Sequence, residues 1–242
     1  MEFKIDFHVH SDASPDGMSS IGDLAKAAAG AGLSAIAIAD HNMFTLSEIV
    51  EQDGVLLLPA CEISTRRGHI LALMCSEPID MEKLMASGIP SAEDAAAAIH
   101  GCGGIAVVAH PFDRRERDLS GMQELIDGVE TANSRAYFHN LNANKMAKEF
   151  ADEFRLLEFG GSDAHSVKAV GNCYTSVFAD SFEDVRSAIE SGNGKAVFVR
   201  NTPKIQKGLS QFKMARNSGS AYKFIRGIAY VCYCALKDVF ER

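Results

Sequence analysis

Short apolar runs of strand length alternate with helical patterns over residues 3–200, and this alternation restricts the folds open to the chain. Parallel strands joined by crossover helices form either a closed α/β barrel or an open, doubly wound sheet. The sequence contains neither G-x-G-x-x-G nor G-x-x-x-x-G-K-[ST], so the nucleotide-binding forms of the open sheet are disfavoured. The pattern therefore predicts an α/β fold of one of these two kinds.

The expected elements follow from apolar periodicity and from helix-capping residues. Strands are expected at 3–8, 34–39, 55–61, 69–75, 104–109, 128–132, 155–160, 172–178 and 195–200. Helices are expected near 19–31, 43–52, 91–101, 139–153 and 181–191. Two helix starts show the serine and acidic spacing of an N-terminal cap, Ser91 with Asp94 and Ser181 with Asp184.

Charge separates the last part of the chain from the rest. Residues 204–242 carry eight Lys and Arg against two acidic residues, a net charge of +6 in a chain whose total is −8. We therefore expect a barrel domain over 1–203 and a basic helical extension over 204–242. The apolar stretch 227–236 is too short to cross a bilayer. It is expected to pack on the barrel or on a second copy of the chain, giving a homo-oligomer, with a membrane-surface helix as the alternative.

Composition gives broader limits. With 47% hydrophobic and 23% charged residues, the chain is typical of globular proteins. Its start lacks the features of a signal peptide, no apolar run reaches the ~18 residues of a membrane-spanning helix, and the six cysteines lack paired spacing. These features predict a cytoplasmic protein without a transmembrane segment. The acidic body argues against duplex nucleic acid as a partner, because duplex binding requires neutralisation of phosphates.

Histidine and acidic residues gather where the expected strands end, with one more at the start of a strand and one in a loop. The set is His8, His10, Asp16, His41, Glu62, His69, His110, Asp163 and His165. The carboxyl ends of parallel strands form one face of an α/β barrel, so these side chains are expected to meet there. Residues i and i+2 of a strand point the same way, so the H-x-H and D-x-H pairs each direct two side chains to one point.

The residue types indicate a metal site. Imidazoles with a few carboxylates suit Zn, Mn or Fe better than Ca or Mg. A lone histidine on an apolar strand is usually a packed core residue, but six of the 8 histidines of the chain belong to this set. One metal uses three or four ligands, so nine candidates predict two or three divalent transition metal ions that share a bridging carboxylate.

The segments HVHSDASPDG, ADHN, CEIS, GHIL, AHP and GSDAH resemble the successive motifs of the PHP (polymerase and histidinol phosphatase) family of metal-dependent phosphoesterases. The resemblance covers about residues 3–200 and implies a distorted (β/α)7, TIM-like barrel followed here by a C-terminal helical tail. It implies one metal on His8, His10, Glu62 and Asp163, a second on Asp16, His41 and His165, and a third on Glu62, His69 and His110.

Residues beyond the ligands are also expected to contribute. Asp40 and Arg135 are the catalytic candidates; Asp40 would orient an imidazole or cap a strand end. Arg135 ends the segment VETANSR, which resembles a family strand end bordering the metals, and this implies that it binds phosphate. The candidates for substrate binding are Ser11, Arg66, Arg67, Arg114 and Arg135, with Arg115 and Arg117 beside them.

The resemblance implies a phosphoric ester hydrolase, a phosphomonoesterase or cyclic phosphodiesterase, that works through a hydroxide bridging the metals. Only 47 residues separate Glu62 and His110, too few for a large insertion over a nucleotide. A small phosphorylated metabolite is therefore expected as substrate, such as a sugar or nucleoside phosphate, or a cyclic diester that is opened and then dephosphorylated. The alternatives are a 5′–3′ exonuclease on short oligonucleotides and a non-catalytic, metal-stabilised PHP module.

Overall fold

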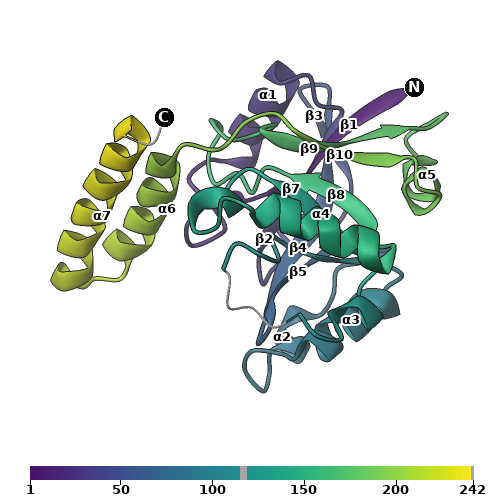
Figure 1. The fold of residues 1–242 in the computed structure, drawn as a ribbon, viewed down its shortest axis with the longest axis horizontal. Coiled ribbons are helices and arrows are strands. Elements are labelled where there is room, and N and C mark those ends of the chain that lie inside the picture. Colours follow the sequence, from purple (N-terminus) through teal and green to yellow (C-terminus); the bar gives the residue numbers. More distant parts are fainter. Residues whose placement is uncertain (115–118, 241–242) are drawn as a thin grey trace.

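A 10-stranded sheet forms the centre of the protein in a computed structural model that describes residues 1–114 and 119–240 (Figure 1). The strands are β1 (Glu2–Val9), β2 (Ala35–His41), β3 (Val50–Gln52), β4 (Val55–Thr65), β5 (Gly68–Leu73), β6 (Ile105–Val108), β7 (Gly128–Asn133), β8 (Leu157–Gly161), β9 (Cys173–Phe178) and β10 (Gly194–Phe198). The helices are α1 (Ile21–Gly30), α2 (Met81–Leu84), α3 (Ala92–Gly101), α4 (Ala143–Phe154), α5 (Val185–Glu190), α6 (Lys204–Asn217) and α7 (Ala221–Phe240).

The sheet curls into a nearly closed barrel. Its order is β10-β9-β1-β2-β4-β5-β6-β7-β8, with β3 paired to β4 outside this path. Strands β1, β2 and β4 run parallel, as do β6, β7 and β8. A bridge between Val9 and Ala164 joins the end of β1 to the segment after β8. The expectation of a distorted α/β barrel with a helical tail is confirmed.

Some neighbouring strands are antiparallel, where the sequence pattern predicts parallel ones. Strand β5 is antiparallel to both β4 and β6, and β9 is antiparallel to β1 and β10. The β4–β5 connection explains the first case, because Thr65 pairs with Gly68 and only Arg66 and Arg67 lie between them. A two-residue connection can join only antiparallel strands.

The expected helix at 43–52 is wrong. Residues 50–52 form β3, which pairs antiparallel with β4 from Gln52–Val55 to Val50–Leu57. Asp53 and Gly54 connect the two strands with φ of 53° and 76°. An Asp-Gly pair with positive φ at both positions is the turn that two-residue hairpins favour, and it ends any helix before this point.

Apolar side chains fill the barrel and the space beneath the helices. Ile5, Phe7 and Phe159 are buried inside the barrel, where the two phenylalanine rings meet edge to face at 5.3 Å. Outside it, Leu24 and other residues of α1 pack on β2 and β4, and alanines of α3 and α4 pack on β5, β6 and β7. Small alanines let these helices lie close to the sheet, and this packing fixes where each strand ends.

The tail forms a helical hairpin beside the barrel, drawn in yellow-green and yellow in Figure 1. The carboxylate of Asp238 on α7 accepts hydrogen bonds from the backbone N–H groups of Lys204 and Ile205 at 2.7 and 2.8 Å, which caps the start of α6. Gly227 permits close contact, because a Cβ there would lie 2.9 Å from Phe212 Cδ2. A domain boundary at residue 203 stays a prediction. Among the described residues, no helix is long and apolar enough to cross a membrane.

One face of α7 is apolar and exposed, at the heptad spacing of a helix–helix seam. The seam consists of Tyr222, Ile225, Ala229, Cys232, Leu236 and Val239. Its length of about 26 Å matches α7 of a second copy, given the rise of ~1.5 Å per residue.

We therefore expect the parent protein to have twice the monomer mass in light scattering, and Leu236→Glu to return it to the monomer mass. Leu141→Glu, at an exposed leucine outside the hairpin, is the control. A parent protein of monomer mass would contradict this expectation.

Candidate metal centre

The nine side chains singled out in the sequence converge at one end of the barrel. His8 lies in β1 and His10 directly follows it, His41 ends β2, and Asp163 and His165 follow β8; the others come from β4, β5 and the segments after β1 and β6. His8 and His10 are fully buried. The other seven line a cavity of about 150 Å³, and they are Asp16, His41, Glu62, His69, His110, Asp163 and His165.

The deepest group contains His8, His10 and Glu62. The Nε2 atoms of the two histidines lie 3.1 Å apart, and each lies 3.4 Å from Glu62 Oε2. Asp163 Oδ1 is 3.5 Å from His10 Nε2 and 4.0 Å from His8 Nε2. These four side chains are the ones that the sequence resemblance implies for a first metal.

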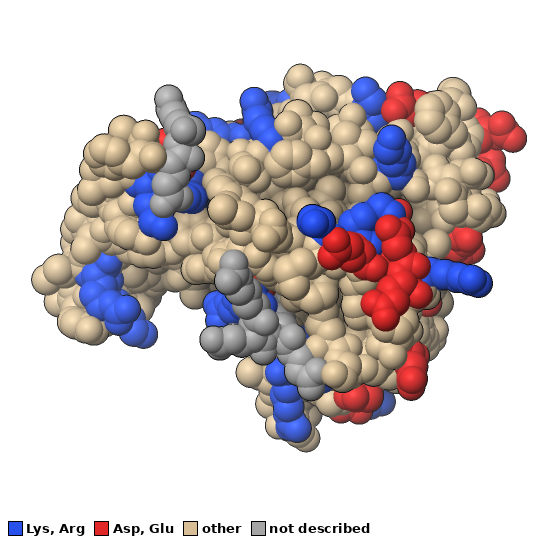
Figure 2. Space-filling model, in the orientation of Figure 1, with Lys and Arg blue, Asp and Glu red and all other residues tan. Residues whose placement is uncertain are grey.

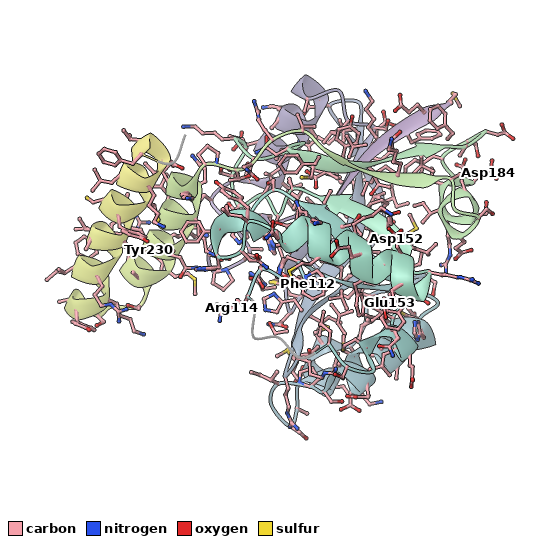
Figure 3. The ribbon with its side chains drawn as sticks, viewed as in Figure 1. Phe112, Arg114, Asp152, Glu153, Asp184 and Tyr230 are labelled. Carbon is pink, nitrogen blue, oxygen red and sulfur yellow. The ribbon has the colours of Figure 1, made fainter. Side chains whose placement is uncertain are left out.

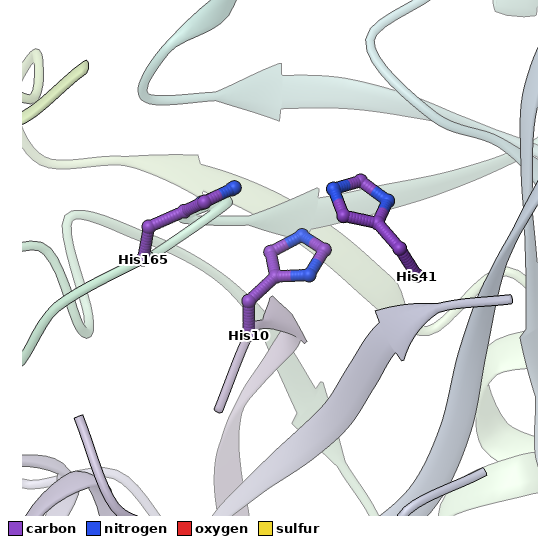
Figure 4. Close-up of side chains that lie close together, drawn as sticks. All are labelled: His10, His41 and His165. Atoms are coloured by element: carbon purple, nitrogen blue, oxygen red, sulfur yellow. The ribbon is translucent and has the colours of Figure 1, made fainter. Parts of the chain in front are cut away.

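A second group surrounds Asp16. Its Oδ2 lies 3.0 Å from His165 Nε2, and its Oδ1 lies 3.6 Å from His41 Nε2. Figure 4 shows the rings of His10, His41 and His165 turned toward one another, with centroids 4.5 Å (His10–His41) and 4.2 Å (His10–His165) apart. The second expected set is thus also brought together, next to the first.

The third group forms around the other oxygen of Glu62. Glu62 Oε1 lies 2.6 Å from His69 Nδ1 and 3.0 Å from His110 Nε2, while Oε2 lies 2.9 Å from His41 Nδ1. Glu62 is 1% exposed and contacts histidines of all three groups. A carboxylate in this position can bridge cations that are bound side by side.

The hydrogen bonds behind these atoms fit a cation. His8 Nδ1 lies 3.0 Å from the Glu130 carboxylate, and His10 Nδ1 lies 3.4 Å from a Ser14 hydroxyl that itself donates to Asp40. Both Nδ1 atoms are therefore assigned as N–H donors, so in the neutral rings, the form that binds a metal, the two Nε2 lone pairs face each other at 3.1 Å. A divalent ion between them removes this repulsion.

Two buried carboxylate oxygens add to the fit. Within residues 1–114 and 119–240, Asp16 Oδ1 is buried and accepts no hydrogen bond, and Glu62 Oε2 is buried with the ring nitrogens of His8, His10 and His41 at 2.9–3.4 Å. A buried acceptor without a donor is costly, and a metal ion satisfies it. Nitrogen and carboxylate donors together suit divalent transition metals.

When protons alone balance the charges of the site, the pKa values of its histidines and carboxylates are shifted from their ordinary values. Burial by itself would lower the pKa values of His8 and His41, but the carboxylates of Glu62, Glu130 and Asp163 outweigh it. They raise the pKa of His8 well above its ordinary value, and Glu62 with its neighbours raises that of His41 to about 9. Burial would also raise the pKa of Glu62, but the surrounding imidazoles hold it well below the ordinary value. Protons and metal ions therefore compete for these groups.

The comparisons with known proteins agree with this geometry. Residues 142–193 match a family model described as PHP-associated. An uncharacterized protein of Methanocaldococcus jannaschii is 29% identical over 180 residues, which cover 71% of this chain and 69% of that protein. The PHP motifs lie at the strand ends of the barrel that the structure shows. Residues 142–193 and the segments at the strand ends are thus similar to those of the PHP family.

Solved structures share the PHP barrel. A two-domain protein of Bacteroides vulgatus containing a predicted PHP-like metal-dependent phosphoesterase superposes with a TM-score of 0.61 at 22% identity. The match covers 82% of this chain, which spans only 65% of that larger protein. The lesion-specific endonuclease Q of Pyrococcus furiosus matches with a TM-score of 0.59 at 19% identity, over 81% of this chain and 58% of the endonuclease. At these identities the likeness shows the fold alone.

One further solved structure bears on the expectation from charge. Endonuclease Q has been solved in complex with a 27-mer duplex that carries an abasic lesion at the active site. The prediction that duplex nucleic acid is excluded as a partner does not fit this finding. The physical reason is that net charge describes the whole surface, whereas binding depends on the local field around the site.

The structure separates the expected catalytic and substrate-binding residues into two groups. Asp40 accepts hydrogen bonds from Ser11 N, Ser11 Oγ and Ser14 Oγ at 2.6–2.8 Å, so it reaches His10 only through Ser14. Ser11 is fully buried behind the ligands. Arg135 and Arg114 line the cavity, and Arg135 Nη1 donates to Asp163 Oδ1 at 3.4 Å.

Arg66 and Arg67 do not line the cavity. Arg66 is exposed at the β4–β5 turn. Arg67 contacts the Ser120 carbonyl and lies 3.9 Å from Glu93 on α3. Arg115 and Arg117 lie outside the described residues. Adjacency in sequence to a ligand-bearing strand therefore did not place Arg66 and Arg67 at the site.

Sequence reasoning missed Glu130, which is 1% exposed. Besides His8, its carboxylate binds His110 N–H and Asn133 Nδ2 at 2.8 Å each. The VETANSR segment that pointed to Arg135 contains this residue and could have indicated it. Lys207 and Gln211 of α6 also line the cavity, and no motif marks them. Burial, and then the nearby Arg135, lowers the pKa of Lys207 to about 8.

Replacing Glu130 by Gln should weaken metal binding. The amide removes the negative charge that makes the His8 imidazole a stronger electron-pair donor to a metal. It also turns an N–H₂ group toward His8 Nδ1 or the backbone N–H of His110, which donate hydrogen bonds to the carboxylate. Loss of such a carboxylate behind a ligating histidine typically costs about 10–100-fold in metal affinity. Competition titration with a chelator measures the change. Glu158→Gln is the control, since Glu158 lies on the neighbouring strand β8 and pairs with Lys148 of α4. Equal affinities in the two variants would contradict the expectation.

Proposed function

We propose that this chain is a metal-dependent phosphoesterase acting on the phosphate ester of a small metabolite. The observation that carries the proposal is the position of Glu62, a buried carboxylate that faces histidines of three adjoining groups at 2.6–3.4 Å. Beside these groups, Arg114 and Arg135 line the same cavity. Negatively charged metal ligands and positively charged side chains around one cavity suit a phosphoryl group.

The residues around the cavity would have different roles in this reaction. The nine histidine and carboxylate side chains would hold two or three divalent ions, Mn, Zn or Fe. When bound, such ions lower the pKa of water and withdraw charge from phosphoryl oxygens. Arg135 would hold a phosphoryl oxygen, since its guanidinium already lies next to Asp163 and is 10% exposed. Asp40 would keep His10 in place through Ser14.

The size of the cavity supports a small reacting group. Pockets that enclose whole small-molecule ligands measure about 300–1,000 Å³. The volume here, about 150 Å³, suits a phosphoryl group with the rest of the substrate extending outward. A sugar phosphate, a nucleoside phosphate or a small cyclic phosphate diester would satisfy this limit.

A substrate panel tests the proposal. The protein is loaded with Mn or Zn, its metal content is measured, and it is offered sugar phosphates, nucleoside monophosphates, cyclic phosphates, trinucleotides and an abasic duplex. Fastest turnover of a monoester or a cyclic diester is expected. Faster cleavage of the trinucleotides would favour the exonuclease alternative, and faster cleavage of the duplex would favour a lesion endonuclease. A metal-replete protein inert on the whole panel would favour a non-catalytic module.

A further inference from the structure

Helix α6 forms part of the cavity wall although it follows the barrel in sequence. Lys207 and Gln211 line the cavity together with Arg114, Arg135 and the expected metal ligands. The two α6 residues are four positions apart, so they project from the same face of the helix. In Figure 3, Arg114 is drawn between the barrel and the hairpin, on the side where α6 approaches.

Three contacts fix α6 to segments that carry expected ligands. The Lys213 ammonium donates to the carbonyl oxygens of Asp12 and Ser14 at 3.2 Å each, and also to that of Gly17, on either side of Asp16. The Ser166 hydroxyl, next to His165, donates to Gln206 Oε1 at 2.9 Å. Arg135 Nη2 donates to Ser210 Oγ at 3.4 Å. These contacts lie on both sides of the cavity and fix the position of α6 relative to it.

The position of the Lys207 ammonium suits an anion. It lies 4.4 Å from the centre of the Phe138 ring and 3.1 Å from His139 Nε2. Neither neighbour is a carboxylate, and within residues 1–114 and 119–240 the carboxylates that act on Lys207, Asp113 and Asp163, form no direct ion pair with it. Figure 2 shows Lys and Arg over the hairpin, whereas Asp and Glu gather on the opposite side of the molecule. A phosphate entering the cavity would therefore meet positive charge from α6.

We propose that Lys207 of α6, with Gln211 beside it, binds the phosphate group of the substrate and so makes the C-terminal hairpin part of the binding site. This inference rests on the proposed function for the nature of the substrate. The lysine would contact phosphoryl oxygens on the side away from the expected ligands. Its ammonium offers three donors that rotate freely, which suits an anion whose oxygens change position during a reaction.

Binding of inorganic phosphate tests the proposal without turnover. The parent protein and its variants are loaded to the same measured content of Mn, and phosphate affinity is determined by isothermal titration calorimetry. Lys207→Met should weaken binding by about 10–100-fold, as expected for loss of a hydrogen bond to a charged group. Lys207→Arg should keep most of the affinity. Lys223→Met, a lysine of α7 that does not line the cavity, should bind as the parent does.

Steady-state kinetics adds a second readout where a substrate has been found, because loss of a phosphate contact should raise KM more than it lowers kcat. Unchanged phosphate affinity in Lys207→Met, or an equal loss in Lys223→Met, would overturn the proposal. A metal-replete parent protein that binds phosphate through Lys207 but hydrolyses no ester would refute the proposed function and leave this inference standing.

Discussion

Replacing Glu62 by Gln is expected to reduce phosphate ester hydrolysis by at least about a thousandfold. Glu62 is the one described side chain placed within 3.4 Å of histidines from all three groups, so its charge acts on every expected ion. Ions at such a site supply several kcal/mol of charge stabilisation, and each ~1.4 kcal/mol corresponds to a tenfold change in rate. The amide keeps the shape of the side chain but neutralises it. Turnover is measured with the best substrate of the panel.

The same variant should also bind less metal, which elemental analysis after dialysis would measure. Glu183→Gln is the matched control, because Glu183 is exposed near α5 and does not line the metal cavity. Circular dichroism should show a folded barrel in both proteins. A Glu62→Gln protein that retains full metal content and parental turnover would contradict the assignment of the site.

The barrel could be predicted because its strands are short apolar runs separated by capped helices. Ser91 shows the value of such local signals, since it is the N-cap of α3 and contacts Asp94 three residues later. Ser181 also contacts Asp184, but α5 begins only at Val185 with Asp184 as its N-cap, so the expected cap at Ser181 is wrong. Strand direction was harder to predict. The antiparallel β5 follows from the length of the connection at 66–67, whose turn contains no glycine or proline at its centre. The Asp53–Gly54 pair is a hairpin signal in the sequence, but the apolar pattern before it predicts a helix over 43–52, and residues 50–52 form strand β3 instead.

The candidate ligands other than Asp16, which lies in the loop after β1, could be predicted because each lies in or beside a strand and alternation fixes its direction. Glu62 and His69 meet because β4 and β5 pair, and His8 and His10 share one face of β1. Lys207 could not be predicted in this way. Its position depends on how α6 docks, which in turn depends on tertiary contacts such as those of Lys213. A helix pattern indicates which face is apolar but not which surface it meets.

Metal-free protein should be most stable near pH 6.5 and lose stability on both sides. The pKa of His41 is raised to about 9 in the folded state, so its contribution is fully present below about 6.5 and lost as the pH rises through 9. The pKa of His10 is lowered to about 3, chiefly by burial, so protonation in the unfolded state reduces stability as the pH falls below about 6.5. A shift of the His41 size corresponds to roughly 3 kcal/mol.

Metal ions should reverse the loss at high pH. Ligand histidines must be neutral, so binding competes with protonation and strengthens as the pH rises from 6 to 9, and a ligand that binds only the folded state stabilises it. Thermal denaturation with chelator and with Mn, at steps of pH between 5 and 9, measures both effects. The difference in melting temperature between the two samples should grow with pH.

His41→Gln removes the titrating group and should flatten the fall in stability of the chelated sample at alkaline pH. His100→Gln, at an exposed histidine on α3, should leave that fall unchanged. A chelated parent protein whose stability rises steadily from pH 6.5 to 9 would show that the carboxylates around Glu62 do not hold protons on these imidazoles.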